Sequence, residues 1–138
     1  MFLDQLNDDQ KRSFLALATR MILADGDLAP EEDGDLDKIR NTLGDDIVAL
    51  PEEVFGATNA AVFGDRASRI ITVFEILLLA FSDKHLHADE STVLQEICRA
   101  LDINEDEKAR FSELAERYIS NPGDGTIRAE VETIIAAG

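Results

Sequence analysis

The sequence predicts an all-α protein, a compact bundle of six or seven helices built around two related helical hairpins. Apolar residues recur at spacings of three and four along most of the chain, which is the pattern of helices with one buried face. No segment sustains the strict alternation of apolar and polar residues that is typical of a half-buried strand. With 138 residues and 45% apolar side chains, the chain suits a single domain over residues 1–138.

The first expected helix can be capped by Asn7 or Asp8, and it ends at residues 25–26. The second expected helix begins near Pro30, because proline loses no hydrogen bond in a first turn and the acids that follow it meet the positive end of the helix dipole. After that helix, residues 44–64 contain glycine, proline and asparagine among short apolar pieces. This stretch predicts a looser connection with one or two short helices.

A third long helix is expected from Asp65, and its residues 70–81 are apolar almost all round. A helix of this kind is typical of the centre of a bundle. Three further helices are expected after it: residues 88–101, a helix capped by Asn104 and stopped at Pro122, and residues 127–136.

An internal repeat relates residues 25–32 to residues 83–90 at an offset of 58 positions. Both segments join two expected helices, so the repeat predicts two hairpins that could pack about a pseudo-twofold axis. The first covers about residues 8–43, the second about residues 66–101, and further helices occupy about residues 104–137. The identical pairs are Asp25 with Asp83, Leu28 with Leu86, Glu32 with Glu90, Leu36 with Leu94 and Ile39 with Ile97.

The sequence Ala24-Asp25-Gly26, followed by an acid, an aliphatic residue, Pro30-Glu31-Glu32 and a new helix, resembles the TerB family of tellurite-resistance proteins. The likeness covers residues 8–43 and, through the repeat, residues 73–101. In the second loop Lys84 replaces the glycine of the family pattern. The resemblance implies a compact helical bundle, an acidic divalent-cation site at the paired loops, and a role in tellurite or related chemical stress.

Carboxylates are dense in residues 25–37, which hold seven of them and no Lys or Arg. Clustered oxygen ligands favour the hard ions calcium and magnesium, whereas zinc would depend on His85 and His87 and is less favoured. The loop is not an EF-hand, because Pro30 and Leu36 stand where that loop needs glycine and glutamate. The candidate metal ligands are Asp25, Asp27, Glu31, Glu32, Asp83, Asp89 and Glu90.

A structural role is the alternative for the same acids. Asp25 can cap a turn, Glu31 and Glu32 can favour a helix start, and the other acids can form a solvated face. In that case the protein is an acidic scaffold that docks a basic protein partner without an ordered ion. The formal net charge of −16 disfavours nucleic acid and anionic membranes as partners under either interpretation.

Two buried candidates have a structural interpretation. Glu75 interrupts the apolar helix and needs a partner or water there, and Arg20 or Arg69 could supply the charge. Cys98 is expected to be a core or half-buried thiol. The sequence shows no phosphate loop, nucleophile elbow or dinucleotide fingerprint, so we expect no enzymatic activity.

The sequence also predicts a cytoplasmic protein that does not insert into a membrane. The longest uncharged run, residues 54–64, has 11 residues, whereas a spanning helix needs about 20. Residues 1–10 contain an early acid and lack the basic start and apolar stretch of a secretory signal. A single cysteine fits a reducing compartment.

Overall fold

The computed structural model describes residues 2–23, 39–44, 46–48, 52, 54, 56, 60–82, 88–123 and 125–137. Within these ranges the regular structure is helical and contains no strand, which confirms the predicted all-α class. The long helices are α1 (Asp8–Leu23), α4 (Arg66–Ser82), α5 (Ala88–Ala100), α6 (Glu105–Ser120) and α7 (Gly125–Ala137), with short 3-10 helices η1 (Leu3–Gln5) and η2 (Ala60–Val62). Residues 39–43 are also helical.

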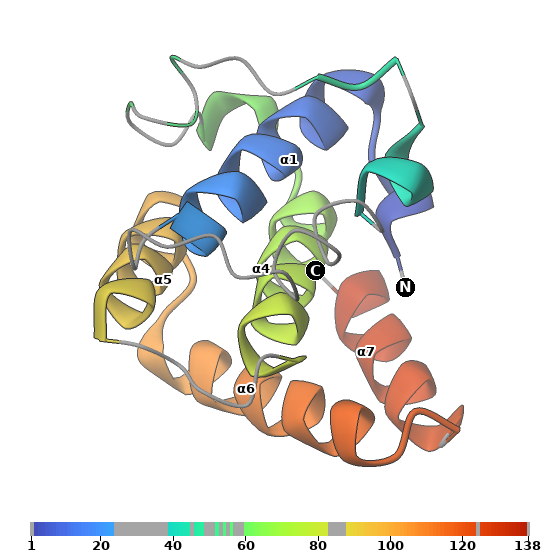
Figure 1. Cartoon of the computed structure of the whole chain (residues 1–138). Helices are drawn as coiled ribbons and strands as arrows, with labels where there is room; N and C mark the ends of the chain where they lie inside the picture. Colours follow the sequence, from blue (N-terminus) through green and yellow to red (C-terminus); the bar gives the residue numbers. More distant parts are fainter. Residues whose placement is uncertain are drawn as a thin grey trace.

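Helix α4 lies at the centre of the bundle. It packs against α1, α5, α6, α7 and η1, which surround it in Figure 1. Every residue from Ile70 to Leu77 is buried, because this part of α4 is covered on all sides. The prediction of a central apolar helix is therefore confirmed, and the buried side chains of the other helices join it in one hydrophobic cluster.

Side-chain caps fix where α1, α4 and α6 begin. The Asn7 side chain accepts a hydrogen bond from the Gln10 N–H (2.8 Å), and the Gln10 side chain accepts one from the Asn7 N–H (3.0 Å). At α4 the Asp65 carboxylate accepts from the Ser68 N–H (3.1 Å). Asn104 forms a similar reciprocal capping box at α6. The cap of the first helix is thus Asn7, and the predicted cap of α6 is confirmed.

The spacing of the sequence repeat recurs in the fold. The caps of α1 and α4 lie 58 positions apart, and so do the first residues of these two helices. Leu43 and Leu101 are both buried at the same separation. Each is followed by a residue with positive φ, Gly44 at 108° and Asp102 at 59°. Equivalent helix starts and stops therefore occur at the offset that relates the two acidic segments.

Candidate functional site

The predicted cation site falls mainly on segments that the structure does not describe. Asp25, Asp27, Glu31, Glu32 and Asp83 lie outside the described residues, as do His85 and His87. Asp89 and Glu90 belong to the first turn of α5, where the backbone but not the side chains is described. Among the side chains that are described, no three of His, Cys, Asp or Glu are grouped so that they could hold a metal ion.

A described helix precedes each acidic segment. α1 ends at Leu23, just before Asp25, and α4 ends at Ser82, just before Asp83. Each acidic segment therefore follows directly on a helix of the 58-residue repeat. Helix α5, which begins within the second acidic segment, packs against both α1 and α4.

Arg20 links the last turns of α1 to the connection after residue 44. Its Nε donates a hydrogen bond to the Val54 carbonyl oxygen (2.9 Å), and its Nη2 donates to the carbonyl oxygen of Gly56. Arg69 likewise donates from Nε to the Phe63 carbonyl (2.7 Å). These two arginines, considered above as partners of Glu75, thus satisfy main-chain oxygens of the irregular segments.

Glu75 is buried, with 7% of its surface exposed, and its Oε1 accepts a hydrogen bond from the Phe2 N–H at 2.7 Å. The prediction that this carboxylate needs a partner is confirmed. A partner is supplied by the main chain of a segment 73 positions away, which sequence spacing gives no means of finding.

An ion pair joins α4 to α6 and was also missed by sequence reasoning. The Arg66 guanidinium pairs with the Glu107 carboxylate and donates to the Asp102 carbonyl oxygen (2.8 Å). The hydrogen bond from Arg66 holds the pKa of Glu107 below its ordinary value of 4.5, against the opposing effect of partial burial. Asp102 is the residue with positive φ after α5, so this pair also holds the turn between α5 and α6.

A second polar cluster surrounds the start of α4. Gln10 is buried and donates from Nε2 to the Val62 carbonyl oxygen (3.2 Å) and to Asp65 Oδ1 (3.4 Å). The Ser68 hydroxyl donates to Asp65 Oδ1 (2.8 Å), and this bond is the main reason why the pKa of Asp65 is lowered. The cluster joins α1, η2 and α4 and has a structural explanation throughout.

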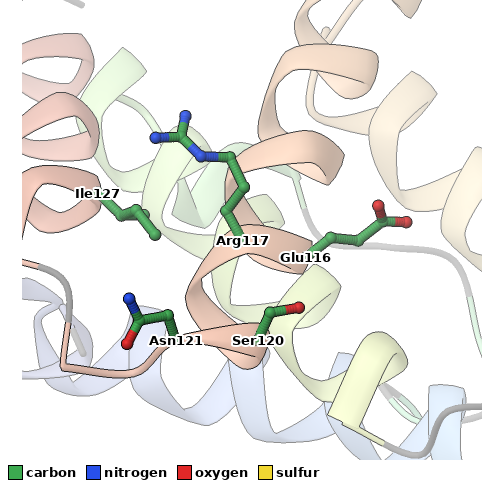
Figure 2. Close-up of a pocket in the computed structure, with 5 residues that line it drawn as sticks. All are labelled: Glu116, Arg117, Ser120, Asn121 and Ile127. Atoms are coloured by element: carbon green, nitrogen blue, oxygen red, sulfur yellow. The ribbon is translucent and has the colours of Figure 1, made fainter.

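A shallow, open hollow of about 380 Å³ lies between α6 and α7 (Figure 2). Ile127 enters it from α7, while Glu116 and Arg117 leave α6 in different directions. Arg117 pairs with Glu130 across the two helices at 3.5 Å. Ser120 and Asn121 complete its lining. The lining of the hollow contains both polar and apolar atoms, and none of its residues was predicted to form a site.

Cys98 is buried at 3% exposure, so of the two predicted positions, core or half-buried, it takes the core one. Burial raises its pKa to about 11, so the thiolate is scarce at neutral pH. A nucleophilic role would need the opposite shift, since the thiolate is the reactive form.

Two further results bear on function. Within the described ranges no helix is both long enough and apolar enough to span a bilayer. Comparison with protein-family models, with curated proteins and with solved structures finds no match to this chain.

Proposed function

We propose that this protein is a TerB-like acidic module of the cytoplasm, a binding protein rather than an enzyme. In this proposal it binds a divalent cation at its two acidic inter-helix segments and acts in the response to tellurite or related stress. The observation that carries the proposal is the 58-residue repeat, which relates the acidic segments in sequence and also relates the helix starts and stops around them in the fold.

The argument from the repeat concerns the surroundings of the acids. Residues 25–32 follow α1 and residues 83–90 follow α4, and these two helices begin with equivalent caps. In the sequence Asp25, Glu31 and Glu32 thus have carboxylate counterparts in Asp83, Asp89 and Glu90, whereas Asp27 corresponds to His85. Paired segments rich in carboxylate oxygen are suited to calcium or magnesium, which take about six or more oxygen ligands. Zinc is the less favoured ion because it would depend on two histidines of one repeat.

Thermal unfolding of chelator-treated protein with calcium, magnesium or zinc tests the proposal. An ion present at about 100 times its dissociation constant should stabilise the fold by about 2.7 kcal/mol. The double variant Asp25→Asn, Glu32→Gln should lose that response. A matched control is Asp106→Asn, Glu113→Gln, which removes the same charge from exposed positions of α6 and should keep the response. If no ion raises the melting temperature of the parent, the cation site is rejected.

The alternative function is an acidic scaffold for a basic protein, with no ion required. It is favoured by the exposed carboxylates of α6, which include Glu105, Asp106, Glu113 and Glu116. Binding of this kind should weaken steeply with added salt and should not respond to a chelator. Binding that instead requires calcium or magnesium would favour the cation module.

A further inference from the structure

We draw no further inference here: the strongest candidate, the open hollow between α6 and α7, is a shallow surface depression whose Arg117 already pairs with Glu130, and nothing in the structure shows what covers it.

Discussion

The Thr72 hydroxyl is buried, and its oxygen has no hydrogen-bond partner in the part of the chain that the structure describes. A buried polar atom without a partner costs about 1–3 kcal/mol. We therefore expect Thr72→Val to raise the free energy of unfolding by about 1 kcal/mol in denaturant titrations. Ser68→Ala is the control of opposite sign, because the Ser68 hydroxyl donates to Asp65 and its loss should destabilise. Destabilisation by both changes would contradict this account of Thr72.

Gly44 has a φ of 108°, a conformation that side chains with a Cβ rarely adopt. Apart from its chain neighbours, no described residue has a heavy atom within 4 Å of where a Cβ would stand, so Gly44→Ala tests backbone strain without a steric clash. We expect it to lower the unfolding free energy by about 1–2 kcal/mol. Gly125→Ala is the matched control, since it also meets open space but shows no positive φ. Equal effects of the two changes on the melting temperature would show that the turn at residue 44 is not strained.

Between elements, the Arg66–Glu107 pair should make stability depend on pH. The pKa of Glu107 is lowered in the folded state, so its carboxylate favours folding above the unfolded value of about 4.5. That contribution disappears as the pH falls through the lower folded pKa. Glu107→Gln should therefore cost about 1 kcal/mol at pH 7 and progressively less below pH 4.5, as measured by thermal melts across pH.

The exposed Arg128–Glu132 pair of α7 provides the comparison for that experiment. Its two residues are four positions apart on one helix and are 59% and 52% exposed, so the pair is strongly screened by solvent. Glu132→Gln should change stability little at any pH. If both glutamate variants behave alike, the link between α4 and α6 does not contribute as the geometry requires.

At the scale of the whole molecule, chemical labelling of the Cys98 thiol can report unfolding of the helical bundle. Its thiol is buried inside the bundle, and burial raises its pKa to about 11. We expect Ellman's reagent to label the native protein very slowly at pH 8, and labelling to accelerate along the same denaturant curve as the loss of helical circular dichroism. Fast labelling under native conditions would show that α5 opens separately from the rest.

Sequence reasoning was most successful where the determining contacts are local. The apolar run 70–81 predicted α4, and Asn104 predicted the start of α6, because periodicity and capping depend on residues within one or two turns. Residues that meet across the fold gave no such signal. Arg66 and Glu107 are 41 positions apart, and Phe2 and Glu75 are 73 apart.

The acidic segments and the contacts of Phe2 also differ in how far the sequence reveals them. The acidic segments stand out by composition alone, since their carboxylates are consecutive or nearly so. Composition does not give the relative positions of these carboxylates, because segments far apart in sequence are positioned by the packing of the whole chain. The buried position of Phe2 could not be predicted from the sequence, because Phe74, Glu75 and Arg128 come together around it only after α7 has packed on α4.

Residues 2–6, where Phe2 packs against Phe74 of α4, also bear on how fast the molecule folds and unfolds. The contact of Phe2 with Glu75 closes a loop of 73 positions, and its contact with Arg128 also requires α7 to be in place. Loop closure on this scale loses more chain entropy than pairing of adjacent helices, so these contacts should form after the rate-limiting step of folding. Changes at Phe2 should then accelerate unfolding while leaving the folding rate nearly constant, which makes residues 2–6 a determinant of the lifetime of the native state.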